Sequence, residues 1–267
     1  MRTEVIGPEN EDPEFSVVYC IHGDEPCGKK AVEKLKTSNY VLDKPVKLVF
    51  ANEEAFKQNE RYLETDLNRV FPGDEESNLH EEKLAAKVYC EVKDTKNLVI
   101  HSTHSQPTPF AIMSTNQYNQ RLAESTQVNW VGVYRDTQGS LECITDSVVV
   151  EAGPQGTEKA TEQAYKCLLN FLSEYDIIDR ETKSKKPQYF HILDKIEKPD
   201  YKFLKRNFEQ VKKGEVYATN NQRDLKAENE FYPFLMSSGG YENMLGFKAE
   251  KIENKNNLEK LIEPQIN

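Results

Sequence analysis

The chain has 267 residues, enough for one large α/β domain or for a domain with a smaller appendage, each with a substantial core. Hydrophobic residues make up 37% and charged residues 30%, as in a soluble globular protein, and no apolar run is long enough to span a bilayer. The net charge of −10 argues against nucleic-acid binding, which requires clustered Lys and Arg.

The N-terminal segment and the cysteines bear on location. Residues 1–15 are acidic and polar and do not resemble a secretory signal. The five cysteines form no C-x-x-C pair, which argues against a disulfide framework and agrees with a reducing compartment. We therefore expect a cytoplasmic protein with neither a nucleic-acid nor a membrane partner.

Short apolar runs alternate with amphipathic stretches through the first two-thirds of the chain. The run 147–151 contains three consecutive valines, which is typical of a central strand. This alternation predicts a mixed, mostly parallel sheet flanked by helices. Strands are expected at 15–21, 46–51, 97–100, 110–113, 130–134 and 147–151, and helices at 26–38, 79–92 and 157–177.

The pattern changes near residue 182. A linker is expected at 184–187, and the following short apolar runs separated by turns predict a small β-rich C-terminal domain. We therefore expect a catalytic α/β domain at 1–182, a β-rich domain at 187–252 that narrows the cleft, and a frayed polar tail at 253–267.

Two segments carry candidate metal ligands. His22 and Glu25 lie in the segment H-G-D-E-P, where Gly23 permits a sharp turn and Pro26 fits a helix start. His101 ends an apolar strand, and ligands of open α/β sheets gather beyond the carboxyl ends of strands. Two His and one carboxylate with an open position are typical of catalytic zinc.

Each of these residues also has a purely structural interpretation. His22 could cap the sheet, Glu25 could stabilise the dipole of the helix that follows it, and His101 could simply end its strand. His104, three residues into the loop, is expected to be a secondary or substrate contact rather than a ligand. His80 and His191 are expected on the surface.

Two further segments carry charged residues in unusual settings. Arg61, Asn68 and Arg69 lie in a loop closed by Pro and Gly, and Arg presents a fork that matches a carboxylate or an oxyanion. Ordinary surface pairing with nearby acids is the alternative. Glu151 ends a buried strand, where a charged carboxylate is energetically unfavourable unless it has a charge partner or a catalytic function. It is either a general base or half of a buried ion pair.

Together these segments resemble the succinylglutamate desuccinylase and aspartoacylase family, within the zinc carboxypeptidase superfamily. The order H-G-D-E, D-L-N-R-x-F, a strand-ending His and V-E-x-G-P-Q carries the resemblance, which extends from about residue 17 to 247.

The resemblance implies a role for each candidate residue. His22, Glu25 and His101 match the ligands of one zinc ion, Glu151 the general base, and Arg61 the arginine that polarises the scissile carbonyl. Asn68 and Arg69 match the pair that holds the substrate α-carboxylate, and Tyr241 matches a tyrosine of the small domain that reaches the cleft.

One departure concerns substrate choice. Aspartoacylases carry a further arginine before the V-E-x-G strand, which reads the aspartate side chain, whereas residues 141–146 here contain two acids and no arginine. The expected activity is zinc-dependent hydrolysis of the amide of an N-acyl amino acid, with aspartate no better as the released amino acid than one with a neutral or basic side chain. The alternatives are a metallocarboxypeptidase acting on short peptides and a non-catalytic metal-binding protein of the same fold.

Overall fold

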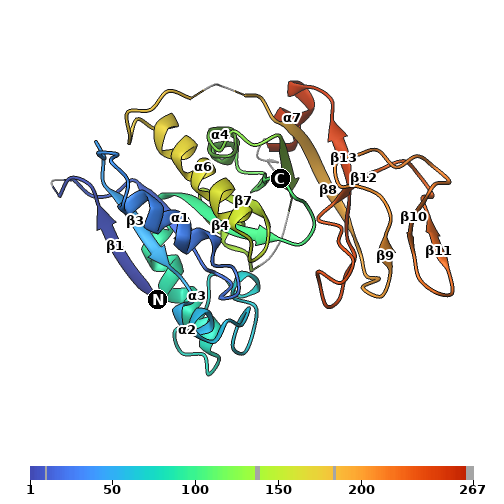
Figure 1. Cartoon of the computed structure of the whole chain (residues 1–267), viewed down its shortest axis with the longest axis horizontal. Coiled ribbons are helices and arrows are strands. Elements are labelled where there is room, and N and C mark those ends of the chain that lie inside the picture. The colour runs from blue at the N-terminus through green and yellow to red at the C-terminus, as the bar shows by residue number, and fades with distance from the viewer. Residues whose placement is uncertain (10, 136–138, 183–184, 263–267) are drawn as a thin grey trace.

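A ten-stranded mixed sheet forms the centre of the protein (Figure 1). The computed structural model describes residues 1–9, 11–135, 139–182 and 185–262. In spatial order the strands of the sheet are β1 (Arg2–Ile6), β3 (Val46–Phe50), β2 (Phe15–Tyr19), β4 (Lys96–Thr103), β7 (Ser147–Pro154), β5 (Phe110–Ser114), β6 (Trp130–Tyr134), β8 (Gln188–Ile196), β13 (Gly246–Ile252) and β12 (Tyr232–Phe234). The central strands β3, β2, β4 and β7 are parallel to one another.

Helices cover both faces of the sheet. One face packs against α1 (Cys27–Lys36), α4 (Gln117–Ser125), α6 (Glu158–Glu174) and α7 (Lys255–Ile262). The other packs against η1 (Leu67–Arg69), α3 (His80–Val92) and α5 (Leu141–Ile144). The short helix α2 (Glu53–Gln58) follows β3. None of the described helices is both long and apolar enough to cross a membrane.

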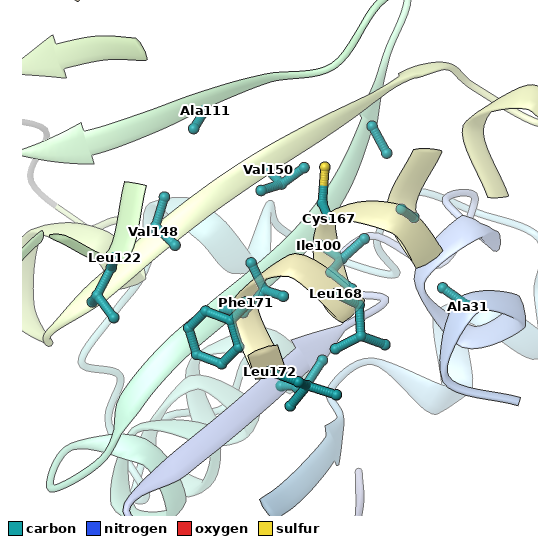
Figure 2. Packing of buried hydrophobic residues seen from close by; sticks show 14 of the residues in the cluster. Ala31, Ile100, Ala111, Leu122, Val148, Val150, Cys167, Leu168, Phe171 and Leu172 are labelled. Atoms are coloured by element: carbon teal, nitrogen blue, oxygen red, sulfur yellow. The ribbon is translucent and has the colours of Figure 1, made fainter. Parts of the chain in front are cut away.

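Strand periodicity decides which side chains face which layer. On β4, Ile100 packs toward α6, close to Leu168 and Phe171 (Figure 2), whereas Val99 packs in the opposite core. Because successive side chains of a strand point to opposite faces, His101 lies on the same face as Val99. On β7, Val150 faces α6 in the same way, so Glu151 shares the face of His101.

The C-terminal β region is joined to the main sheet through its first strand. Strand β8 pairs with β6 in parallel and with β13 in antiparallel orientation, so β8, β13 and β12 extend the ten-stranded sheet. Three short strands form a second sheet, in the order β11 (Asp224–Lys226), β10 (Val216–Thr219) and β9 (Lys202–Phe203). A separate apolar cluster that includes Tyr217, Phe231 and Leu245 supports this region. The division into two domains near residue 187 stays a prediction.

The expected fold class is confirmed, and the six expected strands and three expected helices of the first two-thirds are present. The Thr157 side chain caps α6, since it accepts a hydrogen bond from the Ala160 backbone N–H. The expected frayed tail is corrected over Lys255–Ile262, which form α7 with Leu258 and Ile262 buried. Residues 263–267 of the predicted tail and Ser184 of the predicted linker lie outside the described residues.

Candidate active site

His22, Glu25 and His101 meet at the carboxyl ends of β2 and β4. Nδ1 of His22 lies 2.9 Å from Oε1 of Glu25, and Nδ1 of His101 lies 3.0 Å from Oε2 of the same carboxylate. The two Nδ1 atoms are 3.2 Å apart. All three residues are buried, and each offers one ligand atom within 4.8 Å of the others.

The chemistry of this set fits a zinc ion. Two imidazole nitrogens and one carboxylate are ordinary zinc ligands. Although burial opposes ionisation, the neighbouring His22 and His101 lower the pKa of Glu25 well below its ordinary value, which keeps the carboxylate charged. The Ser102 backbone N–H also donates to Oε2 of Glu25, at 2.9 Å, and fixes its orientation. A cation between these atoms would satisfy three converging ligands at once.

Gly23 lies in the turn between His22 and Glu25, and close packing requires a glycine there. A Cβ at Gly23 would lie 2.2 Å from the backbone carbon of Ala55 and 2.3 Å from the nitrogen of Phe56. Such distances cannot be relieved without moving the backbone of α2. The helix expected from Pro26 begins at Cys27, with Pro26 as its N-terminal cap. The loop that carries His22 and Glu25 is therefore held between α1 and α2.

Asp66 contacts the ring of His22 at Nε2, whereas Glu25 contacts the same ring at Nδ1. Oδ1 of Asp66 lies 3.0 Å from Nε2 of His22, and it also accepts the Asn68 backbone N–H at 3.0 Å. A carboxylate bonded to the second nitrogen of a ligating His fixes the tautomer and raises ligand basicity. Sequence reasoning treated Asp66 only as a charge partner of the loop arginines. Its position one residue before L-N-R was the available signal.

Replacing Asp66 by Asn should weaken zinc binding about 10- to 100-fold, because the ring of His22 would lose its charged partner. The measurement is competition for zinc with a chelator of known affinity. Asp74→Asn is the matched control, since Asp74 is exposed and bonds only within its own turn. Unchanged zinc affinity in the Asp66 variant would remove it from the site.

Glu151 lies on β7 directly beside His101 of β4 in the strand register. Its side chain is partly exposed, yet Oε2 is buried and no described residue hydrogen-bonds to it. Burial raises the pKa of Glu151 to about 8; His101 opposes this shift and Glu25 adds to it. The alternative of a buried ion pair finds no support among the described residues, because no Lys or Arg lies within 4.0 Å of its carboxylate.

Arg61 contacts both Glu25, a candidate metal ligand, and Asp66. Its Nη1 lies 3.4 Å from Oε1 of Glu25, while Nε and Nη2 lie 3.3 and 3.1 Å from Oδ2 of Asp66. The Arg61 side chain is 36% exposed. The loop arginine is thus paired with acids, as the structural interpretation expected, and it also borders the candidate metal position.

Asn68 and Arg69 lie on η1, next to the start of α5. Oδ1 of Asn68 accepts the Leu141 backbone N–H at 3.1 Å, and Nη1 of Arg69 donates to the Asn68 carbonyl at 2.7 Å. The Arg69 side chain is exposed, and no acidic side chain of the described residues pairs with it within 4.0 Å. The guanidinium of Arg69 is therefore available to bind an anionic ligand.

Tyr241 and His104 approach the site from the C-terminal region and from the loop after β4. Burial and the neighbouring Glu151 raise the pKa of Tyr241, so its hydroxyl keeps its proton at neutral pH. The His104 imidazole is exposed, and its backbone carbonyl accepts the Ser237 hydroxyl at 3.3 Å. Tyr241 thus lies near the site, whereas His104 joins the loop to the C-terminal region.

Comparisons with known proteins agree with this geometry. Residues 12–129 match the family described as the succinylglutamate desuccinylase/aspartoacylase catalytic domain. A probable aspartoacylase of Acaryochloris marina is 29% identical over 213 residues, covering 69% of this chain and 71% of the relative.

Solved structures give the same fold. A succinylglutamate desuccinylase/aspartoacylase from Rhodobacter sphaeroides superposes with a TM-score of 0.75 at 16% identity, covering 94% of this chain and 89% of that one. A mutant of murine aminoacylase 3 superposes with a TM-score of 0.70 at 19% identity, covering 91% and 96%.

The matched segment contains all three candidate ligands together with Arg61, Asn68 and Arg69, while Glu151 and Tyr241 lie beyond it. Three of the four motifs that suggested the resemblance therefore lie in the matched segment, and V-E-x-G-P-Q lies beyond it. Residues 12–129 of this chain are therefore similar to the catalytic domain of the succinylglutamate desuccinylase/aspartoacylase family.

Proposed function

We propose that the protein is a zinc-dependent amidohydrolase that removes the acyl group from an N-acyl amino acid with a free α-carboxylate. The observation that supports this most directly is the buried set of His22, Glu25 and His101 with Glu151 beside it on the next strand. The family match points to amide hydrolysis, and the names of its relatives denote removal of an acyl group from an amino acid. The cytoplasmic location stays a prediction.

In this proposal, His22 and His101 hold the metal through Nδ1 and Glu25 through its carboxylate, while Asp66 holds the ring of His22 in place. A bound zinc ion would supply a Lewis acid that lowers the pKa of water toward neutrality and polarises the carbonyl. Glu151 would accept the proton of the attacking water at its unpartnered oxygen and pass it to the leaving amine.

The remaining residues would orient the substrate and stabilise developing charge. Arg61 would donate to the oxyanion from a second N–H of Nη1 or Nη2, an interaction stronger in the transition state than in the ground state. Arg69 would pair with the substrate α-carboxylate, supported by Asn68. Tyr241 would donate a hydrogen bond from its protonated hydroxyl.

The free α-carboxylate should be essential. Amidating it should cost on the order of 2 kcal/mol or more in transition-state binding, since Arg69 would lose its anionic partner. N-acyl aspartate should be no better than substrates with neutral or basic side chains. The measurement is kcat/KM for acetylated and succinylated Asp, Ala, Leu and Lys, each as free acid and as amide.

The same panel, extended with dipeptides, separates the alternatives. Faster cleavage of dipeptides than of acyl amino acids would favour a carboxypeptidase. Zinc binding without turnover of any member would favour a non-catalytic metal-binding protein. Indifference to amidation would remove Asn68 and Arg69 from the substrate site.

A further inference from the structure

Glu81 is a buried acid on α3 that the mechanism above does not use. The residue is 0% exposed. A carboxylate buried to this extent is energetically unfavourable unless hydrogen bonds satisfy its oxygens. The donors that surround Glu81 therefore indicate its role.

Four N–H groups donate to the Glu81 carboxylate. Oε1 accepts the Leu63 backbone N–H at 2.7 Å and a side-chain N–H of Asn52 at 3.2 Å. Oε2 accepts the backbone N–H groups of Glu64 and Thr65 at 3.1 and 3.3 Å. An ionised carboxylate offers about four acceptor sites. The acceptor capacity of Glu81 is thus used in full, mainly by three consecutive backbone amides.

These amides belong to a loop, residues 60–66, that contains no helix or strand. Helices and strands satisfy backbone N–H groups through their own hydrogen bonds, and an irregular loop requires other acceptors. Here one carboxylate on α3 accepts the three amides of 63–65. Arg61 and Asp66 lie on either side of the three amides, so Glu81 fixes the backbone between them.

Both flanking side chains contact the candidate metal ligands. Oδ1 of Asp66 lies 3.0 Å from Nε2 of His22, and Nη1 of Arg61 lies 3.4 Å from Oε1 of Glu25. Nη2 of Arg61 also lies 3.1 Å from Oδ2 of Asp66, which joins the two side chains. A shift of the loop backbone would therefore disturb these contacts together.

We propose that Glu81 is a positioning residue for the metal site, because it holds the loop so that Asp66 can orient the ring of His22. It acts through the loop and not on the metal directly. The inference rests on the proposed function in taking zinc as the metal of this site. Its consequences for zinc affinity and for the loop can be measured without a substrate.

A role in the stability of α3 is the competing explanation. Glu81 and Glu82 both lie in the first turn of α3, where acids stabilise the helix dipole. Glu82 is partly exposed, and the three loop amides donate to Glu81 rather than to Glu82. Glu82→Gln is therefore the matched control, since it removes a charge from the same turn and leaves the loop bonds in place.

Glu81→Gln should weaken zinc binding about tenfold or more, as expected for Asp66→Asn. Glutamine has the shape of glutamate, but its NH2 group would face N–H donors and could accept none of them. The measurement is competition for Zn²⁺ with a chelator of known affinity. Glu82→Gln should stay within about threefold of the unaltered protein. Unchanged zinc affinity in folded Glu81→Gln would overturn the proposal.

A double variant shows whether Glu81 acts through Asp66. Adding Glu81→Gln to Asp66→Asn should weaken zinc binding by no more than about threefold beyond the Asp66 variant alone, because the residue that Glu81 positions is already replaced. Zinc losses that multiply in the double variant would mean that Glu81 acts independently of Asp66, and the proposal would be wrong.

Hydrogen exchange of the zinc-free proteins gives a readout that needs neither metal nor substrate. In Glu81→Gln the amides of 63–65 should exchange faster, while those of the central strands keep their protection. Uniformly faster exchange throughout the protein would indicate a role in overall stability and contradict the proposal.

Glu81→Asp is the second variant, used if the glutamine variant does not fold. It keeps both carboxylate oxygens on a side chain that is one methylene shorter. We expect a smaller loss of zinc affinity than for glutamine, and again little further loss in the Asp66→Asn background. If zinc binds but no acyl amino acid is hydrolysed, the proposed function fails, and the zinc and exchange measurements still decide the role of Glu81.

Discussion

Glu151→Gln is expected to lower turnover by roughly a hundredfold or more while leaving the fold and zinc binding in place. Glutamine has the shape of glutamate but cannot accept the proton of the attacking water. Oε2 of Glu151 is buried without a partner, so the amide replaces no existing hydrogen bond of the described residues. The measurements are kcat, zinc content and circular dichroism of the variant.

The same substitution should stabilise the zinc-free protein at neutral and alkaline pH. Burial raises the pKa of Glu151 to about 8 from an ordinary value of 4.5. Between these values the unfolded chain releases the proton and the folded chain keeps it, so this residue makes stability fall as pH rises. Below about 4.5 both states hold the proton, and above about 8 the loss is complete. The glutamine variant lacks this dependence.

Thermal unfolding of chelator-treated protein at pH 5 and pH 8.5 tests this. The difference in Tm between variant and unaltered protein should be larger at pH 8.5. Glu158→Gln, an exposed acid at the start of α6, should keep both turnover and Tm. Near-normal turnover in folded Glu151→Gln would contradict its role as base. A lower Tm at both pH values would instead indicate a structural partner.

The central strands were predictable because strands that are buried on both faces have continuous apolar sequences. Ser147–Glu151 contains three consecutive valines and lies in the middle of the sheet, with neighbours on both sides. Strand β1 was missed for the opposite reason. Arg2–Ile6 is exposed along most of its length and pairs on one side only, so its sequence is polar and carries no burial signal.

Local sequence patterns did not predict helix α7 or the pairing of β8 with β6. Helix α7 has only Leu258 and Ile262 buried, which is too weak a signal to separate it from an irregular polar tail. The joining of β8 to β6 depends on pairing between segments far apart in the chain. A local β pattern predicts strands there but not the sheet that they join.

The candidate site divides in the same way. His22, Glu25, His101 and Glu151 could be predicted because each follows or ends an apolar strand, and parallel strands bring such ends together. The role of Asp66 could not, because it depends on a side-chain contact with His22. Residue type alone does not distinguish an acid that orients a histidine from one that binds a ligand or lies in solvent.

His101→Ala should remove bound zinc, whereas His104→Ala should leave it. Nδ1 of His101 lies 3.0 Å from Glu25 and 3.2 Å from Nδ1 of His22, so its loss leaves two of the three converging ligands. The exposed His104 makes its hydrogen bond to Ser237 through the backbone, which alanine retains. His101 on β4 and His104 just after it thus form a matched pair.

The measurements are zinc content after gel filtration and zinc affinity by chelator competition. The loss in His101→Ala should exceed the 10- to 100-fold expected for Asp66→Asn, since a ligand matters more than the residue that orients it. Activity should follow the same order, and His104→Ala should keep its zinc even if substrate binding weakens. Equal zinc loss in the two histidine variants would contradict the ligand assignment. Retention of zinc in both would move the metal away from β4, and with it the task proposed for Glu151 on the neighbouring strand.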